Sequence, residues 1–574
     1  MKLTISKSKN SVHFYASKSV IINGKSTTKT VEKIGTLEEV KEKCGDMDPY
    51  EWAKEYVKTL TEKEKENQEG ASIWFSGKKQ IDKGKRQSAN IGYLFLQDIY
   101  YDLKINKICD AISKKYKFTY DLNEILSRLI YSRIIYPGSK KTTWESAGKF
   151  LEKSSFDIHH IYRALEVLAK ENDFIQAKIY ENSKVIFNRQ DRILFYDCTN
   201  YYFEIEREDK FRKYGYSKEH KPNPIVQMGM FMDANGVPLA FSVFPGNSSE
   251  QPSMIPLEKK ILNDFDIDKM VVCTDAGLGS IENRRFNDRF SRSFITVQSL
   301  KKMKSFLQDF ALSSDNWQLS CDNKCYNLND IEAFDDDSFK YYYDKVFYKE
   351  RWINEDNLEQ RLIVTFSFKY RDYLRKIRDG QIERALKIID TKSKLSSRSN
   401  DPKRFVLEKH CTIDGELAEK SKLSLNSQRI AEEEMFDGFY AVCTNLSDPA
   451  PVIIDINKKR WEIEECFRIM KHECKARPVY LSREDRITAH FITCFLALIV
   501  YRILEKKLNS NFSCDSIIDT LRDMNMMLVP GYGYIPTYMR TDLTDALHKA
   551  FGFHTDFEIV SQRNMGKILT KTRN

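Results

Sequence analysis

The chain carries three closely spaced β-rich runs, which are ILFYDCTNYYFE at residues 193–204, PIVQMGMFMD at 224–233 and VPLAFSVFPGN at 237–247. They are rich in the β-branched and aromatic residues that pleated strands favour. The last two runs are separated by Ala234-Asn235-Gly236, a turn sequence typical of β-hairpins. We therefore predict three consecutive strands here, with the last two joined as a hairpin.

The residues that follow alternate between helix and strand. PSMIPLEKKILNDF (252–265) has helical spacing, KMVVCTD (269–275) is a short apolar strand, residues 280–290 are helical, and SFITVQSL (293–300) is again a strand. Three strands, a helix, a strand, a helix and a strand is the order of an RNase H-like fold. The predicted fold class is therefore α/β, with an RNase H-like mixed sheet flanked by helices.

The segments around this core differ in pattern. LNEILSRLIYSRIIY (122–136) and IHHIYRALEVLAKE (158–171) show helical spacing without a competing strand pattern. Asn23-Gly24 predicts a hairpin within a small β element near the N-terminus. The predicted layout is an N-terminal β element and linker (1–90), a helical domain (91–190), the first part of the core (191–300), a β-rich insertion domain (301–450), the second part of the core (451–530) and a C-terminal segment (531–574).

Charge favours nucleic acid only where it is concentrated. The net charge is +9, from 92 basic and 83 acidic residues in 574, which is a mild excess for a chain of this length. Residues 283–304, however, contain seven Arg or Lys and the single acid Asp288. This cluster includes Arg284, Arg285, Lys301 and Lys302, which we predict to contact DNA phosphates. The helical domain is the second candidate for DNA binding, although its pattern does not distinguish a helix-turn-helix from a plain bundle.

Cysteine usage and hydropathy indicate a cytoplasmic protein. The 12 cysteines form no paired framework and lack zinc-site spacing, as expected in a reducing compartment. The N-terminus has no apolar signal region, and the run FITCFLALIV (491–500) is too short to span a membrane. We expect this run to form a buried helix and expect no membrane partner.

Two carboxylates stand where predicted strands end. ILFYD ends at Asp197 and MVVCTD ends at Asp275, so both side chains are expected at the rim of the sheet. Cleavage of a phosphodiester needs an activated water and a stabilised leaving oxygen, which two Mg²⁺ ions about 3.5 to 4 Å apart provide when carboxylates hold them. The sequence therefore predicts Asp197 and Asp275 as ligands of two divalent metal ions.

The third carboxylate is expected on the helical run KKRWEIEECFRIMKHECK (458–475). Glu464 lies on one helical face together with Arg460, Arg468 and Lys471, while the apolar residues of the run fall on another stripe. An acid flanked by bases would bind metal while the bases meet phosphates. We therefore predict the catalytic and metal-binding set Asp197, Asp275 and Glu464.

Each of these residues also has an ordinary structural interpretation. An Asp that closes a strand commonly forms a turn or caps a helix, and Glu464 with Arg468 has the spacing of a surface salt bridge. A strand-terminal Asp also occurs in phosphatases that form an aspartyl-phosphate, but these need a second Asp where this chain has Thr199. The joint appearance of the three acids in the order of the core favours the metal site.

Several segments resemble the DDE transposases of bacterial insertion sequences, whose last motif reads Y-x2-R-x3-E-x6-K. They are FYDCTNYYFE, GYSKEHKPNPIVQMGMFMDANGVPLAFSVFPGN, VVCTDAGLGSIEN, DGFYAVCTN and RWEIEECFRIMKHECKARPVYL. Arg460, Glu464 and Lys471 match the motif, whereas Asn457 stands where the tyrosine is expected. The resemblance is strongest from 190 to 505.

The resemblance implies a DNA-cleaving and strand-transferring enzyme with two Mg²⁺ or Mn²⁺ ions at Asp197, Asp275 and Glu464. It also implies a β-rich insertion between the second Asp and the Glu, in which Trp317 or Trp352 would stack on a flipped base. The expected partners are the terminal inverted repeats and target DNA, bound by a homodimer. A catalytically dead or domesticated DNA-binding descendant is the alternative that Asn457 leaves open.

Overall fold

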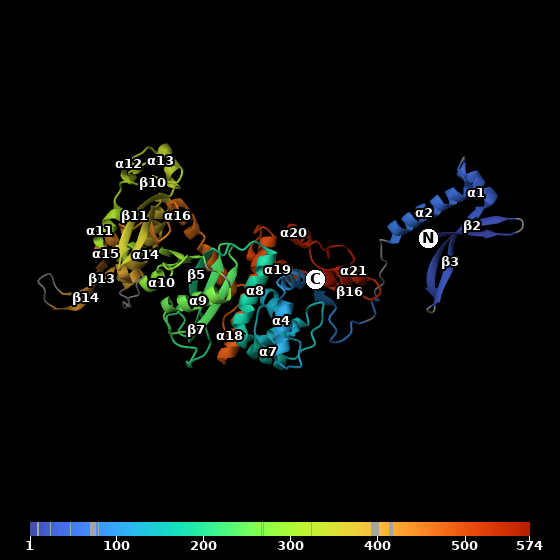
Figure 1. Ribbon diagram of the computed structural model, residues 1–574, viewed down its shortest axis with the longest axis horizontal. Coiled ribbons are helices and arrows are strands. Elements are labelled where there is room, and N and C mark those ends of the chain that lie inside the picture. The colour runs from blue at the N-terminus through green and yellow to red at the C-terminus, as the bar shows by residue number, and fades with distance from the viewer. Residues whose placement is uncertain are drawn as a thin grey trace. The chain divides into compact units, whose positions relative to one another are not determined.

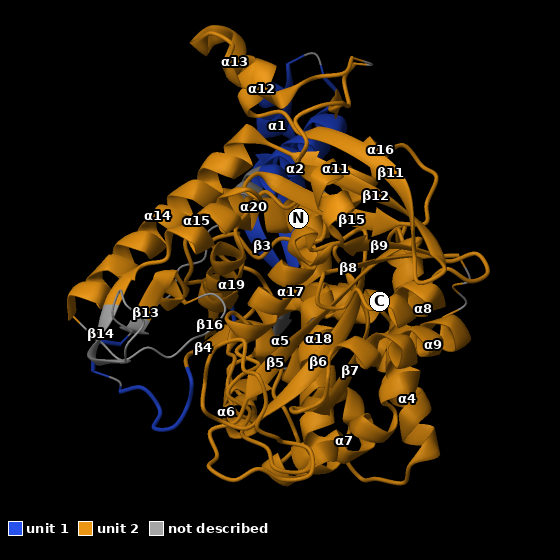
Figure 2. Ribbon diagram, turned by 90° about the vertical axis from the view of Figure 1, so that its left-hand side faces the viewer, with its two compact units in different colours: residues 1–86, 530–532 blue, residues 87–529, 533–574 orange. Residues whose placement is uncertain are grey.

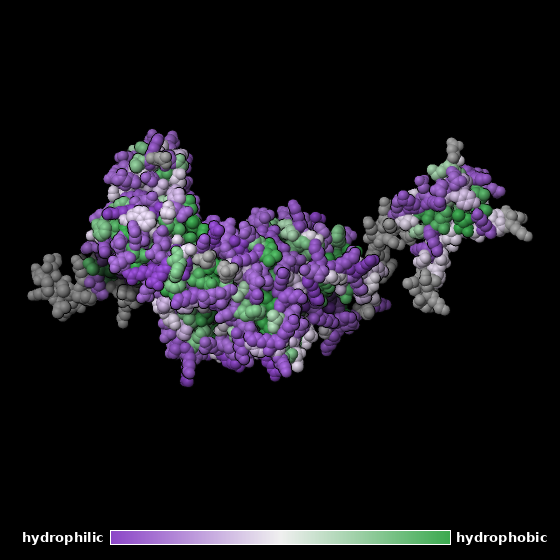
Figure 3. Space-filling view, in the orientation of Figure 1, coloured by the Kyte–Doolittle hydropathy of each residue, from purple (hydrophilic) through white to green (hydrophobic). Residues whose placement is uncertain are grey.

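The computed structural model divides the chain into two compact units, residues 1–86 with 530–532 and residues 87–529 with 533–574 (Figure 2). The structure describes all residues except 9–10, 23–24, 46, 69–75, 79, 266, 268, 323, 392–400 and 412–416. The predicted turn Asn23-Gly24 lies outside the described residues. On the face seen in Figure 3, hydrophilic side chains predominate and hydrophobic atoms show in small separate areas.

The first unit is a small sheet packed on two helices. Strands β1 (Lys2–Lys7), β2 (Val12–Ile22) and β3 (Lys25–Thr36) are antiparallel neighbours in that order. Helices α1 (Leu37–Cys44) and α2 (Pro49–Gln68) follow. The unit has its own apolar core, which includes Phe14, Ile34, Val40, Ala53 and Val57.

The helical region surrounds one long apolar helix of the second unit. The helices that follow β4 (Ser88–Asn90) are α3 (Tyr93–Asp102), α4 (Ile105–Lys115), α5 (Leu122–Ile135), α6 (Lys140–Ala147), α7 (Ile158–Lys170) and α8 (Asn172–Ile186). Helices α3, α5 and α7 pack on α18 (Glu484–Lys507), which is apolar on all sides because it is enclosed (Figure 1). Among the described residues, α18 is the one helix long and apolar enough to cross a membrane, and 94% of its apolar window is buried inside the protein.

The core of the second unit is a mixed α/β arrangement. The strands are β5 (Ile193–Tyr202), β6 (Ile225–Asp233), β7 (Pro238–Pro245), β8 (Val271–Thr274) and β9 (Ser293–Val297), with α9 (Met254–Asp264) before β8 and α10 (Ile281–Phe286) before β9. This is the predicted order of elements. Their spatial order is β9-β8-β5-β6-β7, in which β5, β8 and β9 are parallel neighbours and β6 and β7 pair antiparallel. The β6–β7 turn places Gly236 at a φ of 73°, which glycine adopts without strain.

Residues 301–450 extend this same sheet. Beyond β9 come β15 (Phe439–Thr444), β12 (Leu358–Phe366), β11 (Phe347–Glu355) and β10 (Gln318–Leu319), which makes nine strands in all among the described residues. The sequence predicted a β-rich insertion, and its principal strands add to the core sheet. The helices of this part are α11 (Ser305–Leu312), α12 (Leu328–Glu332), α13 (Asp336–Tyr343), α14 (Phe368–Thr391) and α15 (Ser427–Glu434), and β13 (Val406–Cys411) pairs with β14 (Leu417–Leu425) in a separate ribbon.

The C-terminal part returns to the core and to the helical region. Helices α16 (Ala450–Lys458) and α17 (Trp461–Lys471) precede α18, and α17 packs against both β5 and α18. The remaining elements are α19 (Cys514–Asp523), β16 (Asn525–Val529), β17 (Gly533–Pro536), α20 (Asp542–Phe551) and α21 (Gln562–Lys571). Strand β16 pairs with β4, so the two ends of the second unit share a small sheet.

Candidate active site

Asp197 and Asp275 lie level with each other on neighbouring strands. The parallel pairing of β5 with β8 ends at Phe195 opposite Cys273. Asp197 and Asp275 are each two residues further along, so the register places them side by side where this pairing ends. Asp275 directly follows β8, as predicted. Asp197, however, lies inside β5 and not at its end, because β6 continues to pair with β5 as far as Tyr202.

The charge of Asp275 acts on the carboxyl group of Asp197. Partial burial raises the pKa of the Asp197 carboxyl to about 6, the charge of Lys218 opposes this rise, and that of Asp275 adds to it. The Asp197 carboxylate accepts a hydrogen bond from the backbone N–H of Cys198 at 2.8 Å, and that of Asp275 from the N–H of Leu278 at 2.9 Å. Two half-buried acids held this way favour a cation between them.

Cations approach Asp197 from two elements. Lys218, in the loop between β5 and β6, donates to the Cys198 carbonyl and pairs with Glu250 at 3.3 Å. Lys471 on α17 lies 3.4 Å from Glu219, and burial and the charge of Lys218 lower its pKa to about 8 while Asp197 opposes that shift. Two basic residues therefore lie near Asp197, Lys218 paired with Glu250 and Lys471 with Glu219, and a phosphate group would compete with these acids for them.

Glu464 reaches this region through Arg460. The two side chains form an ion pair at 3.1 Å on α17, and Arg460 also interacts electrostatically with Asp197. The Glu464 side chain is 56% exposed and lines a cavity of about 500 Å³ together with Trp461 and Tyr440. The structure thus brings the two aspartates together. Glu464 is paired with Arg460, and Arg460 in turn interacts with Asp197.

The residues present fit a divalent metal ion by their chemistry. Asp197, Asp275 and Glu464 offer hard oxygen donors, and the repulsion between the two aspartates is what a bound cation would relieve. Among the described residues, the ligand atoms of one group of three lie within 4.8 Å of one another, and it is another set, Asp157 with His159 and His160. Glu464 would therefore have to exchange Arg460 for metal.

Arg468 and Asn457 also have partners within the protein. Arg468 makes two contacts of 2.7 Å with Glu465 and one of 2.9 Å with Glu473, so it does not pair with Glu464. Asn457, at the position of the expected motif tyrosine, donates from its amide to the Tyr440 hydroxyl at 3.3 Å. A phenol from β15 therefore lies next to the substituted position.

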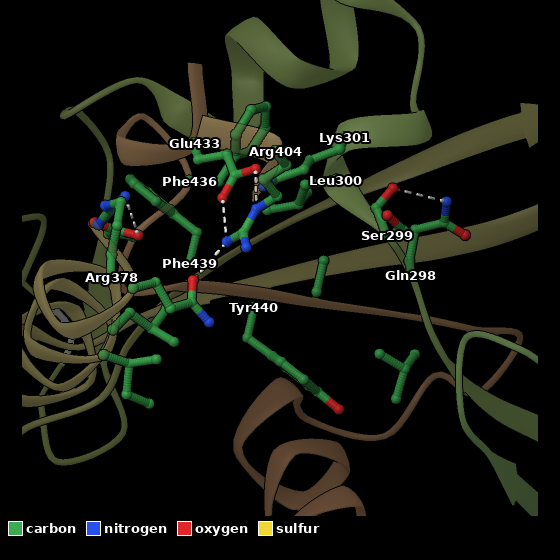
Figure 4. A pocket seen from close by; sticks show the side chains of 16 residues that line it. Gln298, Ser299, Leu300, Lys301, Arg378, Arg404, Glu433, Phe436, Phe439 and Tyr440 are labelled. Atoms are coloured by element: carbon green, nitrogen blue, oxygen red, sulfur yellow. Dashed lines mark hydrogen bonds and ion pairs between the residues drawn. The ribbon is translucent and has the colours of Figure 1, made fainter. Parts of the chain in front are cut away.

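The basic cluster at residues 283–304 does not form one surface. Arg284 is buried and donates to Gln360 at 3.0 Å and Gln298 at 2.7 Å, and Arg285 donates to the carbonyl of Asp356. Lys301 and Lys302 are both exposed, and the Lys301 ammonium group lies over the Phe436 ring at the cavity of Figure 4. The prediction that Arg284 contacts DNA is wrong for this structure, because its buried guanidinium donates its hydrogen bonds to Gln298 and Gln360.

The two candidate tryptophans have opposite environments. Trp317 is fully buried, with its indole N–H donating to the Ser313 carbonyl at 2.9 Å and Lys349 over its ring. It cannot stack on a base in this conformation, which corrects the prediction. Trp352 is 49% exposed on β11 and remains available.

The sequence analysis missed Lys218, Glu219 and Glu250 as members of the site. Lys218 and Glu219 belong to the segment GYSKEHKPN, whose charged residues lie outside any predicted strand or helix. Periodicity gives no indication of where such a loop folds. These residues could have been found from the position of the loop, which connects the strand that carries Asp197 to the next strand of the sheet.

The comparisons with known proteins identify a family for this chain. Residues 189–500, which are more than half of the chain and contain all three predicted acids, match the family described as "Transposase DDE domain". No curated protein matches the chain. A solved structure, the cryo-EM structure of the piggyBac transposase synaptic complex with hairpin DNA, is similar at 8% identity and a TM-score of 0.35, over 84% of each chain. On the match of its central residues, the chain belongs to the DDE transposase domain family.

Proposed function

We propose that this chain is the DNA transposase of an insertion sequence. It would hydrolyse phosphodiester bonds at the element ends and transfer the freed 3′ ends to target DNA. The observation that carries the proposal is the pair Asp197 and Asp275, level on neighbouring parallel strands within the matched family domain. The cations Lys218, Arg460 and Lys471 around Asp197 support a nucleic-acid substrate.

The core that holds these acids is proposed to be RNase H-like. The strand order β9-β8-β5-β6-β7, with β5, β8 and β9 parallel and β6 and β7 antiparallel, supports this proposal. The helical region at 91–190 is proposed to read DNA, and residues 301–450 to act as an insertion that also meets DNA. We assign DNA contact to the exposed side chains Trp352, Lys301 and Lys302 of this insertion and to the exposed Arg285 of the core.

DDE transposases use divalent metal ions, and we propose that Asp197, Asp275 and Glu464 hold two Mg²⁺ or Mn²⁺ ions. Such ions, when bound, lower the pKa of a water and stabilise the leaving oxygen. The protein's own residues orient the substrate. Lys218 and Lys471 would neutralise phosphates next to Asp197, and Arg460 would move from Glu464 to a phosphate oxygen. Because both ends of an element are cut together, the active form on DNA is proposed to be a homodimer.

Cleavage of a plasmid that carries the element ends tests the proposal. We expect nicking with Mg²⁺ and none with EDTA. Asp197→Ala should bind the ends as the wild-type protein does and lose cleavage by at least about 100-fold, because one of the proposed metal ligands is gone. Asp264→Ala, which removes an exposed carboxylate of α9, is the matched control and should cut normally. Normal cleavage by Asp197→Ala would refute the assignment.

A second candidate function is DNA binding without cleavage, by an inactive or domesticated descendant of a transposase. Asn457 in the place of the motif tyrosine and the ion pair of Arg460 with Glu464 favour it. In this case the wild-type protein would bind the ends, and neither Mg²⁺ nor Mn²⁺ would produce cuts. The same plasmid assay, run beside a gel-shift measurement, distinguishes the two functions.

A further inference from the structure

A further cavity, of about 220 Å³, lies in the helical part of the second unit, and its described lining is strongly basic. It is formed by the end of α5, the start of α6, residues 475–481 and α18. Among its described lining residues are five Lys or Arg and one His, with no Asp or Glu. These six are Arg133, Lys140, Lys141, Lys475, Arg477 and His490.

Lys140 is the most telling of these residues. Its side chain is 4% exposed, and its ammonium group has no hydrogen-bond partner. The strongest charge acting on it is that of Arg133, which repels it, and burial together with that repulsion lowers the pKa of Lys140 to about 7. A buried ammonium group without an acceptor destabilises a fold unless an anion from outside joins it.

Arg133 and His490 complete the buried side of the cavity. Arg133 is 2% exposed, donates to the carbonyls of Cys474 and Lys475 at 3.3 and 3.2 Å, and leaves its Nε without an acceptor. His490 is buried, with its Nε2 at 3.0 Å from the Ala476 carbonyl. Burial and the neighbouring cations hold the pKa of His490 well below its usual range, so it is neutral.

The cavity of Figure 4 shows the usual alternative. There Arg404 and Glu433 point toward each other at 3.1 Å, and Arg378 is paired with Asp437. The two arginines lining that cavity are therefore paired with acids of the same chain, whereas the ammonium group of Lys140 has no such partner.

We propose that the cavity around Lys140 binds a phosphate group. Two buried cations, the exposed Lys141 and Lys475 at its mouth and the N-terminus of α6 all favour an oxyanion. The cavity is also connected to the candidate active site, because Arg477 on its wall pairs with Glu219, which pairs with Lys471 beside Asp197. Resting on the proposed function, the phosphate is assigned to the backbone of the bound DNA, at a position away from the cut bond.

The first test measures melting temperature without any DNA or activity. Inorganic phosphate, compared with chloride at equal ionic strength, should raise the melting temperature of the wild-type protein by about 1 °C or more. Lys140→Met should melt above the wild type in chloride, since an unpaired buried charge is gone, and should gain nothing specific from phosphate. Lys140→Gln is the second variant of this position, and Lys549→Met, at an exposed lysine of α20 outside the cavity, is the matched control.

The second test measures binding to a short DNA duplex as a function of salt. One phosphate contact fewer reduces the slope of log K against log salt by about 0.9. We expect Lys140→Met to show this reduction and Lys549→Met to keep the wild-type slope. The proposal is overturned if Lys140→Met behaves as the wild type in both tests.

A change in only one test identifies the source of the phosphate. Loss of the melting response alone assigns the cavity to a free phosphate, and loss of slope alone assigns it to the DNA backbone. If the protein fails to bind DNA at all, the proposed function fails while the melting test still decides the cavity.

Discussion

At the scale of single residues, Glu258 on α9 couples the stability of the core to pH. Its side chain is fully buried, with one oxygen accepting from the Asn287 amide at 3.1 Å and the other without a hydrogen-bond partner. Burial raises the pKa of its carboxyl to about 7 from an ordinary value of 4.5. The folded protein therefore holds the proton more tightly than the unfolded chain does.

A raised pKa stabilises the fold fully below the unfolded value, and this stabilisation is lost as the pH rises through the folded value. We expect the free energy of unfolding to fall by about 3 kcal/mol between about pH 4.5 and 7 because of Glu258 alone. Glu258→Gln should remove this component. Denaturant unfolding at pH 5 and pH 8 measures it, with the exposed Glu282→Gln as control. An unchanged pH dependence in Glu258→Gln would contradict the assignment.

At the scale of elements, a buried ion pair fixes the hairpin that supports Asp197. Arg189, just before β5, contacts Asp233 at the end of β6 at 2.7 Å, and both side chains are at most 1% exposed. The same guanidinium donates to the carbonyls of Val237 and Pro238 in the β6–β7 connection. Since β6 pairs with β5 at Met230 opposite Asp197, this anchor holds the strand that carries the catalytic candidate.

Removing one partner of this pair leaves a charge buried alone. Arg189→Met should lower the free energy of unfolding by about 3 to 5 kcal/mol, because Asp233 keeps its charge without its cation. Arg540→Met, which breaks an ion pair with Asp545 at 2.7 Å whose arginine is 67% exposed, should change it by less than about 1 kcal/mol. Denaturant unfolding of the two variants gives the comparison. Equal losses would show that burial of the pair is unimportant.

At the scale of the whole molecule, the two compact units have separate apolar cores. Phe14 is fully buried in the core of the first unit, and Phe495 on α18 is fully buried in that of the second. Calorimetry should therefore resolve two unfolding transitions. Phe14→Ala should lower the free energy of unfolding of the first unit alone, by about 3 to 5 kcal/mol. Phe495→Ala should lower that of the second unit alone. A single transition shifted by both variants would contradict independent folding.

The sequence by itself determined the local elements and the kinds of chemistry available. The β-branched and aromatic residues and the Ala234-Asn235-Gly236 turn predicted the strands and hairpin of residues 193–247, and helical spacing predicted α9, α17 and α18. These predictions held because strand and helix periodicity arise from neighbours in the chain. The same local reading identified Asp275 next to β8.

Only the tertiary structure decided which distant residues meet. It continued the core sheet through β12 and β15, buried Trp317 and Arg284, and paired Lys471 with Glu219. It also gathered Lys140 with Arg133 and His490 in one cavity. Burial and the pairing of charges depend on contacts between residues hundreds of positions apart. A one-dimensional pattern records which groups can pair, and the packing of the folded chain selects which of them do.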